Sequence, residues 1–214
     1  GSDGRGSPFT FFSPSDREPN ELLASGLSAA QLGVLRQQGF TVIRQRNSRL
    51  LASEVLRLKA PPAISLNTAM EQVRRLAPNA LVDFNHLFRP SNCDGNAHQC
   101  PQAAKQLVGW GEAPSCKVRT VVGLIDTTVD TAHPALRGQA IQVLRVRGDD
   151  REASSATHGT AVASLLVGRP DSATPGLLPR SRLVAADAFH RTGRGEDLMD
   201  AFAFAAALDA LAAQ

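Results

Sequence analysis

The chain has 214 residues, 43% of them hydrophobic, which suits one large globular domain or two small ones. It has 23 Lys and Arg and 20 Asp and Glu, which are interleaved along the sequence and leave a net charge of +3. It has one Trp and no Tyr. We therefore do not expect a nucleic-acid-binding surface, which would more often show concentrated basic residues with stacking aromatics. No apolar run is long enough to span a membrane, and we predict no membrane contact.

The first 26 residues are rich in Gly, Ser, Pro and charged side chains. Such a composition buries little apolar surface, so residues 1–26 are predicted to form a flexible tail.

Residues 27–90 have the pattern of a small α+β domain. Ser28 and Ser65 can each cap a helix, and the first helix should end at Gly39. Residues 40–44 and 53–59 alternate apolar and polar as strands do, and residues 80–88 read as a third strand. We expect two helices over one face of a three-stranded sheet.

The stretch 91–116 is polar, rich in Gly, Pro and Gln, and carries the chain's three cysteines, Cys93, Cys100 and Cys116. We interpret it as an exposed linker. A disulfide in an oxidising compartment is the favoured reading of the cysteines, and the sequence does not say which two pair. A zinc site that adds His98 is the alternative, but zinc ligands usually recur as two short clusters. We therefore predict no metal site and no cofactor.

Residues 117–214 alternate strands with helices. Strands are predicted over 118–125, 141–146 and 182–189, with helices over 159–167 and 196–213. The apolar run 118–125 is typical of a central parallel strand covered on both faces. This pattern predicts part of a doubly wound, parallel α/β sheet.

Two residues of this region suit nucleophilic catalysis. Asp126 follows the first strand directly, at the sheet edge where open α/β folds place their sites. His158 lies at the start of a helix, whose amino terminus disfavours a positive charge on the ring. A histidine that takes a proton from a hydroxyl needs a carboxylate on its other ring nitrogen, so Asp126 and His158 are the candidate catalytic residues.

The sequence segments around these residues resemble the motifs of the subtilisin-like serine proteases, the subtilases. Residues 122–130 read VGLIDTTVD and residues 132–136 read AHPAL, like the aspartate motif of that family. Residues 158–164 read HGTAVAS, like its histidine motif, and residues 176–186 read GLLPRSRLVAA, like the following loop and strand. Two motifs in order and at the family's spacing are a specific signal.

The resemblance implies a protease precursor in two parts. Residues 27–90 would be a ferredoxin-like propeptide that packs on the catalytic domain, and residues 117–214 the N-terminal half of that domain. Thr128 and Ala161 stand where glycine and histidine are common in the family, and neither position carries the proton transfer. Ala135 stands where many subtilases have a calcium-binding aspartate, so no calcium site is expected.

The resemblance also implies that this chain is catalytically incomplete. In subtilisin the serine follows the aspartate and the histidine far downstream, and none of these 214 residues lies in a Gly-Thr-Ser motif. We therefore expect a fragment of a secreted or periplasmic endopeptidase that acts on peptides or proteins, inactive alone. The open edge of strand 118–125 predicts a dimer or a second chain there.

Two other interpretations stay open at this point. In the first, the chain is a non-catalytic binding or inhibitory module derived from a subtilase. In the second, the first domain is a regulatory ferredoxin-like module and the cysteines hold a metal. Sequence downstream of residue 214 and metal analysis would separate these from a protease precursor.

Overall fold

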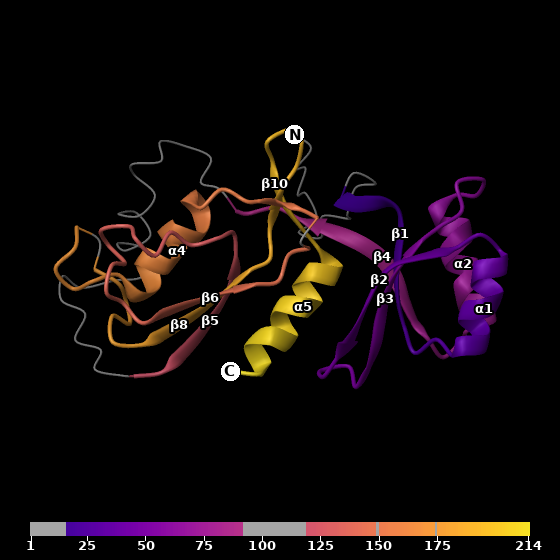
Figure 1. The fold of residues 1–214 in the computed structure, drawn as a ribbon, viewed down its shortest axis with the longest axis horizontal. Helices are drawn as coiled ribbons and strands as arrows, with labels where there is room; N and C mark the ends of the chain where they lie inside the picture. Colours follow the sequence, from indigo (N-terminus) through magenta and orange to yellow (C-terminus); the bar gives the residue numbers. More distant parts are fainter. Residues whose placement is uncertain (1–15, 92–118, 149, 174) are drawn as a thin grey trace, which may run out of the picture. The chain divides into compact units, whose positions relative to one another are not determined.

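The computed structural model describes residues 16–91, 119–148, 150–173 and 175–214, drawn in colour in Figure 1. These residues form two compact units, one of residues 16–47 and 51–87, the other of residues 48–50 and 88–214. The linker 91–116, apart from its first residue, lies outside the described residues, as do the three cysteines and His98. The disulfide therefore stays a prediction.

The first unit is a four-stranded antiparallel arrangement with two helices. Its strands lie in the order β2-β3-β1-β4, and β1 pairs antiparallel with both β3 and β4. In chain order the elements are β1 (Arg17–Ser25), α1 (Ala29–Gln37), β2 (Thr41–Ser48), β3 (Ser53–Lys59), α2 (Leu66–Leu76) and β4 (Leu81–Phe88).

Both predicted helix caps are present in this unit. The Ser28 hydroxyl accepts a hydrogen bond from the Gln31 backbone N–H, and the Gln31 side chain accepts one from the Ser28 N–H, which completes a capping box. The Ser65 hydroxyl caps α2 by accepting a hydrogen bond from the backbone N–H of Thr68. The helices and sheet share a core whose fully buried members include Leu22, Leu35, Leu58, Ala69 and Val73.

The expectation of a flexible tail over residues 1–26 is wrong for Arg17–Ser25. These residues form β1, which lies between β3 and β4. Leu22 and Ala24 alternate with more exposed neighbours and enter the core, which is the period of a strand. The polar composition around them hid this pattern, and the pairing partners are distant in sequence.

The second unit holds a three-stranded parallel sheet in the order β5-β8-β6. A smaller antiparallel group has the order β10-β9-β7. In chain order the elements are β5 (Val121–Asp126), β6 (Ile141–Arg145), β7 (Glu152–Ala153), α4 (Thr157–Val167), β8 (Arg182–Asp187), β9 (His190–Arg191), β10 (Asp197–Asp200) and α5 (Ala201–Ala212).

The two helices of this unit cover opposite faces of the parallel sheet. Ala163 and Val167 of α4 pack with Leu183 and Ala185 of β8. Ala207 of α5 packs in a separate core cluster with Ala186, the neighbour of Ala185 on the same strand. Because successive strand residues point to opposite faces, the two clusters lie on the two sides of the sheet. The protein is therefore a mixed α/β structure.

Two predictions for this unit need correction. The strand predicted to be central is β5, but it lies at one edge of the three-stranded sheet and β8 is central. An apolar run does not tell how many neighbours a strand has, and in β5 it does not mean that both faces are covered, since Val121 is 52% exposed. The helix predicted over 196–213 begins only at Ala201, after β10, because the Asp200 side chain accepts the N–H of Ala203 and caps it there.

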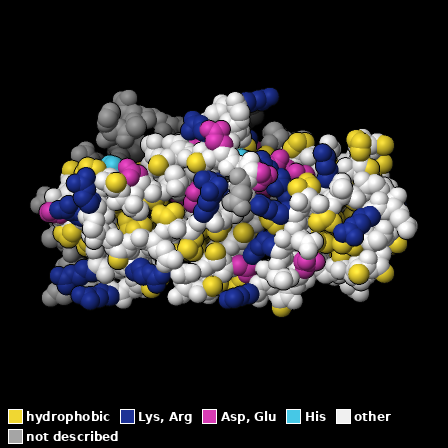
Figure 2. All heavy atoms as spheres, in the orientation of Figure 1, with side chains coloured by type: hydrophobic (Ala, Val, Ile, Leu, Met, Phe, Trp, Pro, Cys, Tyr) yellow, Lys and Arg dark blue, Asp and Glu magenta, His cyan; other side chains and the backbone are white. Residues whose placement is uncertain are grey.

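The surface in Figure 2 shows Lys and Arg spread among other side chains without a continuous stripe on the face drawn. Among the described residues, no helix combines the length and apolarity needed to cross a membrane.

Candidate active site

Asp126 ends strand β5 at the carboxyl edge of the parallel sheet. Its register partner on β8 is Asp187, the last residue of that strand. Asp126 is buried, with 6% of its surface exposed, and its Oδ1 atom accepts a 2.7 Å hydrogen bond from the backbone N–H of Thr127. The side chain is thus fixed at the edge where the sequence placed it.

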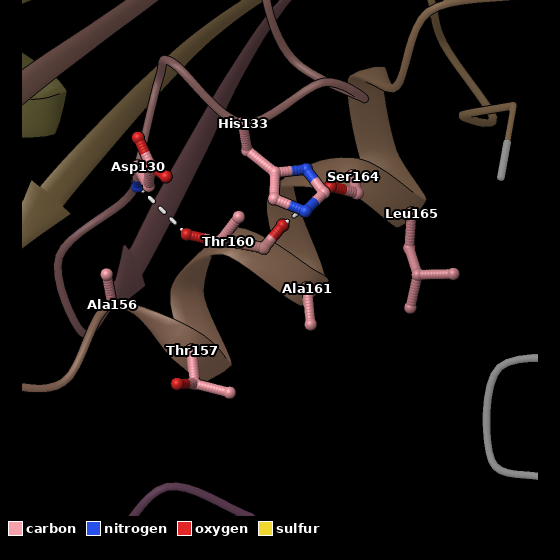
Figure 3. Close-up of a pocket in the computed structure, with 8 residues that line it drawn as sticks. All are labelled: Asp130, His133, Ala156, Thr157, Thr160, Ala161, Ser164 and Leu165. Carbon is pink, nitrogen blue, oxygen red and sulfur yellow. Dashed lines mark hydrogen bonds between the residues drawn. The ribbon is translucent and has the colours of Figure 1, made fainter. Parts of the chain in front are cut away.

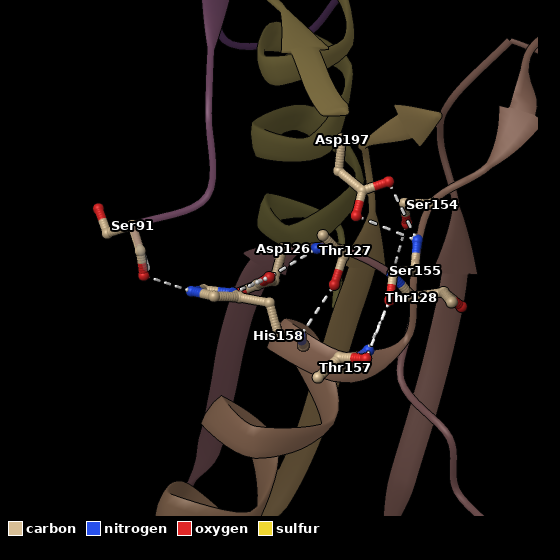
Figure 4. A network of polar contacts seen from close by, with 10 residues as sticks. Ser91, Asp126, Thr127, Thr128, Ser154, Ser155, Thr157, His158 and Asp197 are labelled. Atoms are coloured by element: carbon tan, nitrogen blue, oxygen red, sulfur yellow. Dashed lines mark hydrogen bonds and ion pairs between the residues drawn. The ribbon is translucent and has the colours of Figure 1, made fainter. Parts of the chain in front are cut away.

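His158 is the second residue of α4, and its ring reaches Asp126 (Figure 4). Nδ1 of His158 lies 2.7 Å from Oδ1 of Asp126. The carboxylate can only accept, so Nδ1 donates and carries a proton. The structure brings together the two residues that the sequence singled out, in the geometry by which a carboxylate orients an imidazole.

The start of α4 is held against the end of β5 by Thr127. The hydroxyl of this residue, 1% exposed, accepts a 2.8 Å hydrogen bond from the Gly159 N–H. Next to it, the Thr128 N–H donates to the Ser154 hydroxyl over 3.0 Å. The helix that carries His158 is therefore tied directly to the strand that carries Asp126.

The other ring nitrogen of His158 contacts the chain's own backbone. Nε2 lies 2.9 Å from the carbonyl oxygen of Ser91. A carbonyl oxygen also only accepts, so both hydrogen bonds form together only when the ring carries two protons. In this arrangement the imidazolium is favoured, and Nε2 has no free lone pair with which to take a proton.

The pKa of His158 reflects these contacts. Burial of the ring lowers the pKa, but the hydrogen bond to Asp126, the charge of that carboxylate and the bond to the Ser91 carbonyl together raise it above its ordinary 6.5. The helix amino terminus alone led us to expect the opposite direction. The acceptors on both nitrogens outweigh it.

We expect the bond between His158 and Asp126 to make stability depend on pH. A pKa raised by folding gives a stabilisation that is complete below the unfolded-state pKa and is lost as the pH rises through the folded-state pKa. The drop in unfolding free energy caused by His158→Gln should therefore be larger near pH ~6 than near pH ~9, by urea denaturation followed by circular dichroism. In a chain that already carries Asp126→Asn, His158→Gln should lower the unfolding free energy by similar amounts at the two pH values. Equal losses at both pH values in the chain with Asp126 intact would contradict a pH-dependent bond between His158 and Asp126.

A cavity of about 450 Å³ lies along α4 (Figure 3), and neither Asp126 nor His158 is among the residues that line it. His133 and Asp130 border it on one side, and Thr157, the neighbour of His158, lines it at the start of the helix. The Thr160 hydroxyl accepts the N–H of Asp130 over 2.8 Å, which fixes the loop after β5 on the helix. Its remaining lining is Ala156, Ala161, Ser164 and Leu165.

Residues that sequence reasoning missed complete this region. Ser91, Ser154, Ser155 and Asp197 all contact the candidate pair or the loop that leads to it. No local pattern marked them, because their partners lie between 26 and 67 residues away. Within the described residues, no three His, Cys, Asp or Glu side chains converge as metal ligands.

Comparison with known proteins bears on the same region. Residues 118–211 match the subtilase family, peptidase family S8. The chain is 30% identical over 147 residues to a thermophilic serine proteinase of Bacillus sp. (strain AK1), a match that covers 63% of this chain and 36% of that protein. This chain thus spans about a third of the length of that relative.

Two solved structures share shorter similarity. They are the self-cleaved protease domain of PatA and the patellamide maturation protease PatA, each 33% identical over 31% of this chain and 24% of theirs. Their TM-scores of 0.26 and 0.25 support no conclusion about the fold. Asp126 and His158, joined by the 2.7 Å contact, both lie inside the segment 118–211 that matches the subtilase family.

Proposed function

We propose that this chain is part of a secreted or periplasmic subtilisin-like serine endopeptidase precursor. Residues 117–214 would be the N-terminal half of a doubly wound catalytic domain, and the first unit, including β1, a ferredoxin-like propeptide. The observation that carries the proposal is the 2.7 Å bond between Nδ1 of His158 and Oδ1 of Asp126.

The proposed chemistry is acyl transfer through a serine supplied by sequence downstream of residue 214. Nε2 of His158 would take the hydroxyl proton as Oγ bonds the peptide carbonyl carbon, and would return it to the amine as the C–N bond breaks. Water would release the acyl group by the same proton path. Asp126 would hold the imidazole in the tautomer that leaves Nε2 free and stabilise the imidazolium that forms.

The backbone contact at Ser91 supports the precursor part of the proposal. As long as its carbonyl accepts from Nε2, the base cannot take a proton from a hydroxyl. This state of the site is an inactive one. Displacement of residue 91 would be required before catalysis.

Labelling of the complete gene product with a fluorophosphonate probe tests the proposal. We expect the processed protein to be labelled on one serine within a Gly-Thr-Ser motif, and labelling to fall at least about 100-fold in His158→Ala, because the serine then lacks its base. A complete product that has no such serine, or that is labelled equally well without His158, would refute a protease function. The non-catalytic module would then be favoured.

A further inference from the structure

A carboxylate outside the family motifs holds the loop that leads to His158. Asp197, at the start of β10, accepts the backbone N–H of Ser155 with both oxygens, at 3.1 and 3.2 Å. Figure 4 shows its side chain pointing at this loop. Asp197 has only 15% of its side chain exposed, and Arg191 on β9 lies 3.9 Å from it.

The contact continues from Ser155 into the first turn of α4. The Ser155 hydroxyl accepts the N–H of Thr157 over 3.3 Å and lies 3.0 Å from the Thr157 hydroxyl. The residue next before the helix, Ala156, makes no side-chain cap. Ser155 thus binds the N–H of Thr157, and Thr127 binds that of Gly159, so side chains from outside the helix take over the capping of its first turn.

The backbone around this loop makes Asp197 well placed to fix it. Strand β7 ends two residues before Ser155 and pairs with β9, which in turn pairs with β10. On the other side, the Ser154 hydroxyl holds the loop to Thr128. The loop is therefore held between the hairpin that carries Asp197 and the strand end that carries Asp126.

We propose that Asp197 is a positioning residue for His158, acting through Ser155 to keep the imidazole on Asp126. The catalytic consequence of this positioning rests on the proposed function, whereas the positioning of His158 by Asp197 can be measured in this chain alone. If the Ser155 tie is lost, the first turn of α4 can move, and Nδ1 of His158 spends less time on the Asp126 carboxylate. A 2.7 Å bond tolerates little displacement before it weakens.

The experiment is a pH titration of the His158 ring in the 214-residue chain, followed by the ¹³Cε1–¹Hε1 resonance in two-dimensional NMR. We expect Asp197→Ala to lower the pKa of His158 by at least half a unit, because the bond to Asp126 that raises it is less populated. Asp197→Asn keeps an acceptor for the Ser155 N–H and should restore at least half of that shift. Glu196→Ala removes an adjacent, exposed carboxylate and should leave the titration unchanged.

Three results would overturn the inference. The first is an unchanged His158 titration in a folded Asp197→Ala chain, which would limit Asp197 to a structural role in the hairpin. The second is an equal shift in Asp197→Asn and Asp197→Ala, which would mean that charge alone acts on the ring. If Asp197→Ala does not fold, hydrogen exchange of the native chain decides: the Ser155 N–H should be protected, and random-coil exchange there would refute the tie.

This experiment fails separately from the labelling experiment. The titration needs no serine nucleophile and no peptidase activity. If the His158 pKa falls in Asp197→Ala as expected but the gene product is not labelled, the positioning role stands and the protease function is refuted. If the gene product is labelled but the His158 pKa does not change in Asp197→Ala, the protease function stands and the positioning role is refuted.

Discussion

In the complete, processed enzyme that we propose, replacing Asp126 by Asn should lower kcat by about 10⁴-fold at neutral pH, an effect of the size that triad carboxylates have elsewhere. The Oδ1 atom of Asn can still accept the Thr127 N–H, so the local backbone should persist. What is lost is the charge that stabilises the imidazolium, and the side-chain N–H₂ can present a donor to Nδ1. KM should change far less than kcat, because neither loss concerns ground-state binding.

The pH profile of the same variant gives an independent check. In the native enzyme the acid limb reports the pKa of His158, which Asp126 raises. With Asn at position 126, the carboxylate charge that raises the pKa of His158 is gone, while burial of the ring still lowers this pKa. The acid limb of the pH profile should therefore move to lower pH. In the proposed mechanism residue 91 is displaced from Nε2 of His158 in both enzymes alike, so the comparison isolates the contribution of Asp126.

Asp171→Asn is the matched control. Its carboxylate is 67% exposed and pairs with Arg169 on the surface. Exposed pairs contribute little, so kcat and the pH profile should stay within about twofold of the native values. Retention of more than a tenth of native kcat in Asp126→Asn would remove this residue from the catalytic assignment.

The features that sequence predicted correctly are local ones. Ser28 and Ser65 cap helices through bonds that span three residues, and the strand Ser53–Lys59 has the predicted bounds. The positions of Asp126 after a strand and of His158 in a first helical turn are also local. Their approach over 32 residues followed from placing both at one sheet edge, together with the family motifs.

The features that sequence did not predict depend on distant partners. β1 is recognisable as a strand only once β3 and β4 lie on both sides of it. The Asp197 carboxylate meets Ser155 across 42 residues, and the Ser91 carbonyl meets His158 across 67. A backbone carbonyl or a lone aspartate has no pattern that marks it, so only the folded chain reveals these contacts.

Substitution of Gly159 by Ala should lower the free energy of unfolding of the second unit by about 3 kcal/mol or more, as overpacking against backbone does. A Cβ at this position would overlap the carbonyl oxygen of Thr127 and lie 2.7 Å from that of Thr128. Neither oxygen can move freely, because both belong to the chain segment that follows Asp126. The helix must shift instead, and the Gly159 N–H would lose its bond to the Thr127 hydroxyl.

Gly33→Ala in α1 is the matched control, since no atom lies within 4 Å of a Cβ built there. Alanine favours a helix interior by about 0.5–1 kcal/mol over glycine, so this variant should be slightly more stable than the native chain. Urea denaturation followed by circular dichroism measures both, and the His158 resonance reports whether the ring has left Asp126. A Gly159→Ala chain as stable as the native one, with His158 titrating normally, would show that α4 does not need this close approach to β5, and that the contact between His158 and Asp126 is set elsewhere.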